Sequence, residues 1–237
     1  MISKADPWSF FDKIYCISID TRIDRRTEAK KQFSKCGLLE RVEFIRVKKH
    51  PSNQEKGIFQ SHVQCLKKGL QEGGEHILVF EDDILIRNFQ PQSLHNAAEF
   101  MKKTPGWNAF FLGAISSKIR KTDTLSIVSI QFKCLAHAYA LNKSFAKHIV
   151  QQPWNGTPFD NLLQEQSKMS FAISPMIAFQ SPTSTDNQTA ILDRVRRFFG
   201  GLLFIQKSNE FFQCHKTPIV YSHIAFFTLL VLIGFCW

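Results

Sequence analysis

The sequence predicts an α/β fold in which helices cover a largely parallel sheet. Its first hundred residues alternate short apolar segments with amphipathic ones, which is the strand–helix–strand order of such sheets. Gly (11) and Pro (9) are sparse in the 237 residues whereas Phe occurs 23 times, which favours long elements around a bulky core over a short-stranded all-β fold. The length fits a single domain, and the last nineteen residues are an apolar tail.

The first half of the chain has the most regular pattern. Apolar segments followed by acidic or basic residues predict strands, and segments with one apolar face predict helices. In the second of these helices, Ile58, His62, Leu66 and Leu70 recur every four residues, before Gly73 and Gly74 end it. The strands are expected at residues 13–20, 42–47 and 77–80, and the helices at 21–33 and 54–72.

The second half is less regular, and no internal repeat or clear linker is visible. Asn142 is a good N-cap for a helix that begins at Lys143, and Pro175 interrupts the last apolar stretch. Residues 181–189 are polar without periodicity, which is typical of a loop. Strands are expected at 108–112, 125–130, 135–141 and 169–180, and helices at 143–151 and 159–166.

Lys plus Arg number 30 and Asp plus Glu number 20, so the formal net charge is +10. Such an excess favours a polyanionic partner such as an anionic membrane surface or a phosphorylated small molecule. Nucleic acid is not expected, because the basic residues are scattered and form no basic–aromatic motif. No two of the six cysteines lie within three residues of each other, which excludes a C-x-x-C zinc or redox unit. We therefore expect reduced, mostly buried thiols and, since residues 1–11 lack a signal peptide, a cytoplasmic location.

The C-terminal tail, residues 219–237, contains no Asp, Glu, Lys or Arg. As a helix it would span roughly 28 Å, close to the thickness of a bilayer's hydrocarbon core. Residues 191–218 before it mix Arg and Lys with Phe and Leu, as interfacial segments do. We predict a catalytic domain at 1–190, a basic amphipathic juxtamembrane segment at 191–218 and a membrane anchor at 219–237, on the cytoplasmic side of the inner membrane. The alternative is a terminal element buried in the core of the domain.

Three consecutive carboxylates, Glu81, Asp82 and Asp83, directly follow the third predicted strand in the segment ILVFEDDI. Ligands of open α/β sheets bind beyond the carboxyl ends of strands. A dense negative cluster there is costly unless a cation shares it, and hard oxygen ligands favour Mg²⁺ or Mn²⁺. The alternative is a solvated acidic turn.

Basic residues follow the first strand in the segment ISIDTRIDRR. Guanidinium groups suit phosphate recognition, although a solvated helix start would show the same pattern. A further segment, GIFQSH, places Ser61 and His62 on the second helix, where a histidine on an apolar face is usually a core residue. The candidate residues of the first segment are Asp20, Arg22, Arg25 and Arg26.

In their order along the chain, which is ISIDTRIDRR, GIFQSH and ILVFEDDI, the three segments resemble glycosyltransferase family 25. That family includes bacterial lipopolysaccharide and lipooligosaccharide galactosyltransferases and is related to collagen galactosyltransferases. The resemblance continues through CLAHAYALNKSFAKHI (residues 134–149) and PFDNLL (158–163) to SPMIAFQ (174–180), so it covers about residues 13–190.

This resemblance implies a GT-A fold, which is a Rossmann-like mixed sheet with flanking helices. It implies an inverting, Mn²⁺- or Mg²⁺-dependent hexosyltransferase, of β-galactosyltransferase type, that uses UDP-galactose or UDP-glucose and a saccharide or glycolipid acceptor. Asp82 and Asp83 would hold the metal ion. The residues implied at the donor are Asp20, Arg22, Arg25, Arg26, Ser61, His62 and Glu81.

An inverting transfer also needs a carboxylate that takes the proton of the acceptor hydroxyl. We expect Asp160 to be this base, with Asp186 in the polar loop as the rival and an ordinary first-turn acid as the alternative for Asp160. The competing function is a non-catalytic protein with a degenerate transferase fold that binds a nucleotide sugar or acts as a membrane scaffold.

Overall fold

The computed structural model describes residues 6–181 and 201–235, with side chains described as far as Thr228 in the last helix. Asp186 and residues 191–200 lie outside this part of the chain, as do the final two residues of the tail. The helices are α1 (Ile23–Lys35), α2 (Gln54–Gln71), α3 (Pro91–Lys102), α4 (Lys143–Val150), α5 (Phe159–Gln166) and α7 (Gly201–Phe235). The strands are β1 (Lys13–Ile19), β2 (Glu43–Val47), β3 (His76–Glu81), β4 (Ile84–Ile86), β5 (Ala109–Phe111), β6 (Ile115–Lys121), β7 (Ile127–Cys134), β8 (Ala138–Asn142), β9 (Ser170–Ile173) and β10 (Ala178–Gln180).

Eight of these strands form one mixed sheet in the order β2-β1-β3-β8-β5-β9-β7-β6. The strands β1, β2 and β3 are parallel, as the strand–helix–strand pattern predicts. The expectation of a largely parallel sheet is wrong for the other half, because β8 runs antiparallel to both β3 and β5, and β7 runs antiparallel to both β6 and β9. The predicted α/β fold class, a mixed sheet with flanking helices, is confirmed.

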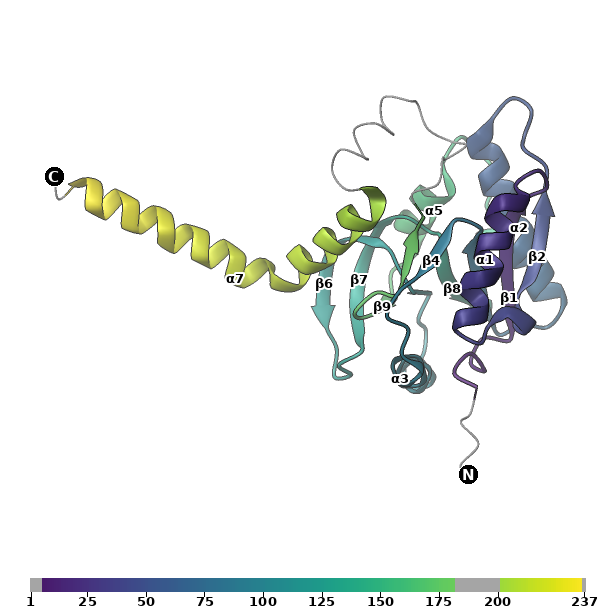
Figure 1. The fold of residues 1–237 in the computed structure, drawn as a ribbon, viewed down its shortest axis with the longest axis horizontal. Helices are drawn as coiled ribbons and strands as arrows, with labels where there is room; N and C mark the ends of the chain where they lie inside the picture. Colours follow the sequence, from purple (N-terminus) through teal and green to yellow (C-terminus); the bar gives the residue numbers. More distant parts are fainter. Residues whose placement is uncertain (1–5, 182–200, 236–237) are drawn as a thin grey trace.

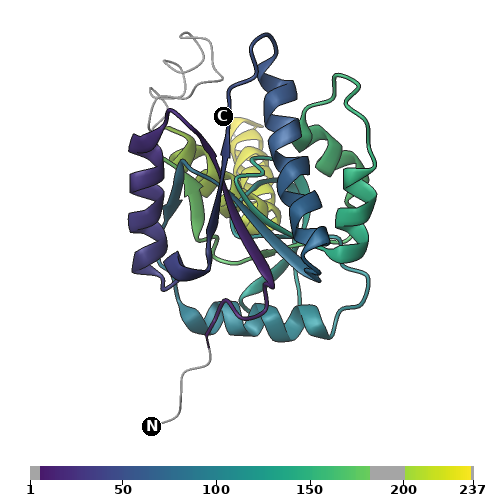
Figure 2. The same cartoon turned by 90° about the vertical axis from the view of Figure 1, so that its right-hand side faces the viewer.

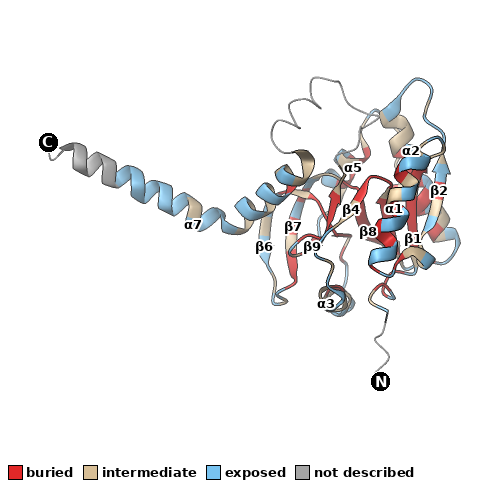
Figure 3. Ribbon diagram, viewed as in Figure 1, coloured by how far each residue is buried: buried red, intermediate tan, exposed pale blue. Residues whose placement is uncertain are grey.

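Helices cover both faces of the sheet (Figures 1 and 2). On one face, Phe59 and Leu66 of α2 pack in a cluster with residues of α4 and α5, such as Ile149 and Leu163. On the other face, α1 and α3 pack in a second cluster with the N-terminal Trp8. The middle of β3, residues 77–80, is fully buried between the two clusters, which accounts for its uninterrupted apolar sequence. Parallel pairing brings the carboxyl ends of β1, β2 and β3 to one edge of the sheet, where β1 and β3 are mostly buried and the outer strand β2 is more exposed (Figure 3).

The short strand β4, helix α3 and strand β6 were not predicted from the sequence. Helix α3 begins with Pro91 in its first turn and buries Leu94, Ala97 and Met101, a spacing that repeats along one face. Strand β6 lies at the edge of the sheet and exposes Lys118 and Lys121, so it lacks the apolar pattern of a buried strand.

Helix α7 has two parts that are separated by a kink at His215, three residues before Pro218. Its first part lies along β6 and β10, whereas its second part extends away from the sheet (Figure 1). In the described portion of the chain, no helix combines the length and apolar character needed to span a bilayer.

Candidate active site

A cavity of about 410 Å³ opens at the edge of the sheet where β1, β2 and β3 end. Parallel strands bring residues that are distant in the sequence to this edge, so the acids after β3 lie near α1 and near Lys48 after β2. The first turns of α2 and α5 complete the wall. Seven of the ten residues selected from the sequence line it: Arg25, Ser61, His62, Glu81, Asp82, Asp83 and Asp160.

Asp82 and Asp83 form an acidic corner of this cavity together with Arg25 of α1. The Arg25 Nη1 atom lies 3.5 Å from Asp82 Oδ1 and 3.7 Å from Asp83 Oδ2, and all three side chains are at least nine-tenths buried. The second oxygens, Asp82 Oδ2 and Asp83 Oδ1, are also buried and accept no hydrogen bond from the described residues. Each carboxylate therefore places one oxygen on the arginine and has the other available for a ligand.

The charges of this corner are incompletely balanced, because one guanidinium faces several carboxylates. Burial raises the pKa of Asp83 to about 7, and the nearby Glu81 carboxylate adds to this effect. Burial likewise raises the pKa of Asp82, although hydrogen bonding with the Ser18 side chain and the charge of Arg25 oppose the increase. A bound cation would stabilise the ionised form of both groups.

Glu81 belongs to a hydrogen-bond network that extends into the core. Its Oε1 lies 3.2 Å from His62 Nε2, and its Oε2 accepts a hydrogen bond of 3.4 Å from Gln180. On its other side, His62 Nδ1 lies 3.0 Å from the hydroxyl of Tyr139, and the imidazole stacks on Phe159. Burial lowers the pKa of His62 to about 4, so the ring is neutral near pH 7 and orients Glu81 without adding charge.

Asp160 lies in the first turn of α5 and lines the same cavity as Asp82 and Asp83. Its Oδ2 accepts a 2.8 Å hydrogen bond from the backbone N–H of Leu135, and its Oδ1 accepts one of 3.2 Å from that of Ala136. Leu135 has a positive φ of 72°, which is uncommon for a branched residue. Asp160 thus holds the β7–β8 connection beside the cavity, and its remaining lone pairs can accept a further hydrogen bond. Burial raises the pKa of Asp160.

The other selected residues lie around the end of β1, outside the lining of the cavity. Arg26 donates hydrogen bonds to Ser18 Oγ and to the backbone oxygens of Ile19 and Asp20, so it fixes the end of the strand. Arg22 forms an ion pair with Asp24. Ser61, within the lining, donates to the Gly57 carbonyl oxygen of its own helix.

The residues fit a divalent cation that is shared with a substrate. No three His, Cys, Asp or Glu side chains are arranged around a common point within the described ranges, 6–181 and 201–228. Mg²⁺, however, is usually bound by one or two carboxylates and completed by water and phosphate oxygens. The two orphaned oxygens of Asp82 and Asp83 match this smaller requirement.

Sequence reasoning missed the roles of Gln180 and Tyr139. Gln180 ends the SPMIAFQ segment and reaches Glu81 because β10 pairs with β4, which immediately follows the acids. The same pairing brings Ser181 N to within 2.7 Å of the Asp83 carbonyl oxygen. The position of Gln180 was visible as a motif, but its partner depends on this pairing between distant segments.

Comparison with known families identifies the chain. The family described as glycosyltransferase family 25, lipopolysaccharide biosynthesis protein, matches residues 40–163, which is more than half of the sequence. The chain belongs to glycosyltransferase family 25. It is therefore a glycosyltransferase, and the matched region contains α2, Asp82, Asp83 and Asp160, whereas Arg25 lies before it.

Comparisons with individual proteins give weaker similarities to this family 25 chain. No curated protein matches it significantly. Among solved structures, it is similar to a mannose-1-phosphate geranyltransferase from Thermus thermophilus, with 10% identity, a TM-score of 0.44 and coverage of 68% of this chain and 73% of that one. It is also similar to a glycosyltransferase involved in the glycosylation of the major capsid of PBCV-1, with 10% identity, a TM-score of 0.41 and coverage of 68% and 80%.

Proposed function

We propose that this family 25 protein transfers galactose or glucose from a UDP-sugar to a saccharide or glycolipid acceptor, with inversion, in lipopolysaccharide or lipooligosaccharide synthesis. The observation that carries the proposal is the acidic corner, where Asp82 and Asp83 each have one oxygen on Arg25 and a second oxygen without a partner. A divalent cation coordinated by the diphosphate of a nucleotide sugar would satisfy both free oxygens. The cavity of about 410 Å³ has the size of a small-molecule site.

In this proposal the residues of the cavity have separate tasks. Asp82 and Asp83 would hold Mn²⁺ or Mg²⁺, and a bound ion would supply Lewis-acid stabilisation of the charge on the diphosphate leaving group. Arg25 orients the two carboxylates through the contacts of its Nη1 atom with Asp82 Oδ1 and Asp83 Oδ2. Lys48 at the rim adds positive charge that attracts the anionic donor. Glu81, oriented by His62 and Gln180, accepts hydrogen bonds from hydroxyl groups of the donor.

Asp160 is the proposed general base toward the acceptor. Its carboxylate is held by two backbone N–H groups and keeps lone pairs that can receive the proton of a hydroxyl. Its burial raises the pKa of the group toward the range in which a carboxylate accepts a proton more readily.

A screen of nucleotide sugars tests this function. The full-length protein is incubated with a mixture of saccharide acceptors and, one at a time, with UDP-, GDP- and TDP-hexoses. The release of the nucleoside diphosphate is measured in the presence of Mn²⁺ and in the presence of EDTA. We expect release from UDP-galactose or UDP-glucose that EDTA abolishes. Tight UDP binding without turnover for any donor would instead support the non-catalytic nucleotide-sugar-binding alternative.

A further inference from the structure

The two parts of α7 differ in how they meet the rest of the protein. In the first part, Gln206 is fully buried and donates a 2.8 Å hydrogen bond to the Ala178 carbonyl oxygen, and Glu210 accepts one of 2.9 Å from Met176 N. After the kink at His215, Pro218 has no N–H to continue the helical hydrogen-bond ladder. The second part projects away from the sheet (Figures 1 and 3).

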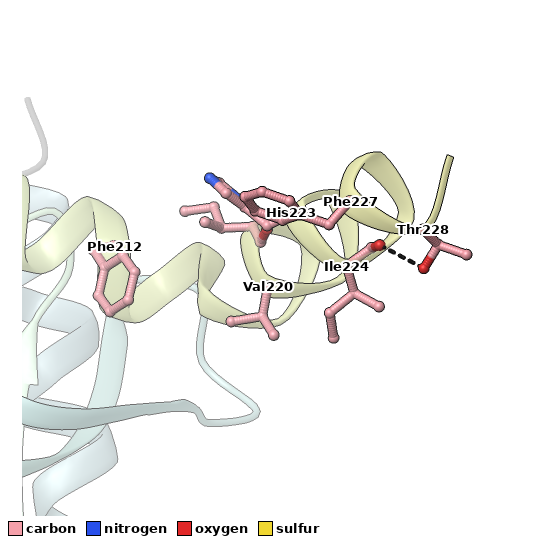
Figure 4. Close-up of a pocket in the computed structure, with 7 residues that line it drawn as sticks. Phe212, Val220, His223, Ile224, Phe227 and Thr228 are labelled. Atoms are coloured by element: carbon pink, nitrogen blue, oxygen red, sulfur yellow. Dashed lines mark hydrogen bonds between the residues drawn. The ribbon is translucent and has the colours of Figure 1, made fainter. Parts of the chain in front are cut away.

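The projecting part, residues 219–228, exposes large apolar side chains. Tyr221, Ile224, Phe226 and Phe227 are each more than half exposed, and Val220 is 42% exposed. Several of these residues line an apolar groove of about 690 Å³ with Phe212 (Figure 4). Large apolar clusters that are exposed to solvent mark sites that bind another apolar surface.

The polar side chains of the same part are hydrogen-bonded to the helix itself. Ser222 Oγ donates 2.8 Å to the Ile219 carbonyl oxygen, and Thr228 Oγ1 donates 2.9 Å to that of Ile224 (Figure 4). The imidazole of His223 lies 2.7 Å from the Ile219 carbonyl oxygen through its Nδ1. These groups already have a partner within the helix, which lowers the cost of moving them out of water.

The distribution of apolar side chains favours lipid over a protein partner. With 3.6 residues per turn, Val220, Tyr221, Ile224, Phe226 and Phe227 spread over about 220° of the helix circumference. A second helix or a protein groove would cover a narrower stripe, typically about 100° wide. Ala225 and Ser222 occupy the remaining sector, so no charged residue interrupts any side of the helix between 217 and 228.

Cations lie where the helix leaves the protein. Two exposed lysines lie here: Lys207 in the first part of α7 and Lys216 directly after the kink at His215. The whole chain carries a net charge of +10. Anionic lipid headgroups would meet these cations when the apolar part enters the layer below them. We propose that the second part of α7 docks this protein on an anionic bilayer, with the apolar side chains of residues 219–228 among the acyl chains and the lysines near the kink at the headgroups.

Flotation of the full-length protein with lipid vesicles tests this proposal. The vesicles contain phosphatidylcholine alone or phosphatidylcholine mixed with phosphatidylglycerol. We expect the protein to float with the mixed vesicles, and the double variant Ile224→Asp/Phe227→Asp to lose at least tenfold in the bound-to-free ratio. The control variant Leu125→Asp changes another exposed apolar residue, in the β6–β7 turn, and is expected to bind as the parent protein does.

A second measurement separates lipid from self-association. The oligomeric state of the parent and of the double variant is determined by light scattering without vesicles, and far-UV circular dichroism with a cooperative thermal transition verifies that the variant is folded. A parent dimer that the double variant makes monomeric, together with no flotation of the parent, would assign the helix to a second copy and overturn the proposal. Equal flotation of the parent and the double variant would also overturn it. Neither result depends on catalytic turnover, so the proposed function is tested independently.

Discussion

At the residue scale, the acidic corner depends on contacts between groups far apart in the sequence. Arg25 and Asp82 are 57 positions apart, yet the pairing of β1 with β3 brings the helix after β1 next to the acids after β3. The segment ILVFEDDI and the arginine-rich segment could each be found in the sequence. The contact between the two segments could not be predicted, and neither could the two oxygens without partners, because both depend on the rotamers of three buried side chains.

Replacing Asp83 by Asn tests the role of this corner. The substitution keeps the size of the side chain and removes the charge that the proposed cation requires. We expect turnover to fall on the order of 10²-fold or more, the magnitude typical of losing one preorganised electrostatic group. Steady-state sugar transfer at saturating Mn²⁺ is the measurement. Asp123→Asn, at an exposed position in the β6–β7 turn, is the control, and parent-like transfer by Asp83→Asn would exclude Asp83 as a metal ligand.

The roles of two further carboxylates of the cavity, Glu81 and Asp160, can be separated by a pair of amide substitutions. In Asp160→Asn, an NH₂ group replaces one of the oxygens that accept from Leu135 and Ala136, so both the base and its support are lost. We expect a decrease in kcat of about 10²- to 10⁴-fold, the usual contribution of a general base. Glu81→Gln retains an oxygen for hydrogen bonding, so we expect a smaller decrease with a raised KM for the donor. The opposite order of the two kcat values would transfer the role of base to Glu81.

His137 gives a stability prediction that is independent of catalysis. It is fully buried, and burial lowers its pKa from 6.5 to about 4. Between these values the unfolded chain binds a proton that the folded chain does not, so this histidine lowers the free energy of unfolding by about 1.4 kcal/mol per unit decrease in pH. Buried carboxylates such as Asp83, with a raised pKa, act in the opposite direction in this window.

The comparison is therefore made between His137→Gln and the parent by urea unfolding at pH 7, 6 and 5. The variant lacks the titrating ring, so its stability relative to that of the parent should increase as the pH falls. If the difference in free energy of unfolding between variant and parent is the same at pH 7, 6 and 5, the pKa of His137 is not lowered in the folded protein.

At the scale of elements, the βαβαβ half was predictable because its signals are local. Buried parallel strands appear as continuous apolar runs, and α2 repeats its apolar residues every four positions. Helix α3 carries a comparable pattern that was overlooked. Strand β6 could not be recognised in the same way, because an edge strand exposes polar and basic residues. The order of β8, β5, β9 and β7 is set by packing between distant segments, which single-segment patterns do not encode.

The first part of α7 is predicted to stabilise the edge of the sheet. Asn209 accepts a 2.9 Å hydrogen bond from Ser116 N and donates one of 3.0 Å to Ser116 O, so it pairs with both backbone groups of one β6 residue. Asn209→Ala should lower the free energy of unfolding by about 1–3 kcal/mol, because partly buried backbone groups lose their partner. Ser208→Ala, at an exposed position of the same helix, is the control. Equal urea midpoints for the two variants would contradict this role.

The same part of α7 connects the C-terminal region to the cavity. Gln206 contacts β10, β10 pairs with β4, and Ser181 after β10 donates to the Asp83 backbone. At Gly113, a Cβ atom would lie 1.8 Å from the Ala178 carbonyl oxygen and 2.8 Å from Gln206 Nε2, so only glycine permits this close crossing. The segment that the sequence indicated as juxtamembrane is, from residue 201 to the kink, packed on the domain that holds the site.

At the scale of the whole molecule, the sheet presents the cavity at one edge and α7 extends from another part of its surface. The family 25 assignment establishes a glycosyltransferase, and the proposed cation-assisted transfer gives separate roles to Asp82, Asp83 and Asp160. The central claim is that a divalent cation at Asp82 and Asp83 links the protein to the diphosphate of the donor.

Calorimetric titration of UDP into the full-length protein tests this claim most directly, since it requires no acceptor. With Mn²⁺ present, UDP should bind, and with EDTA the affinity should fall at least tenfold, because the carboxylates then repel the diphosphate. Equal UDP affinity in Mn²⁺ and in EDTA would contradict the account.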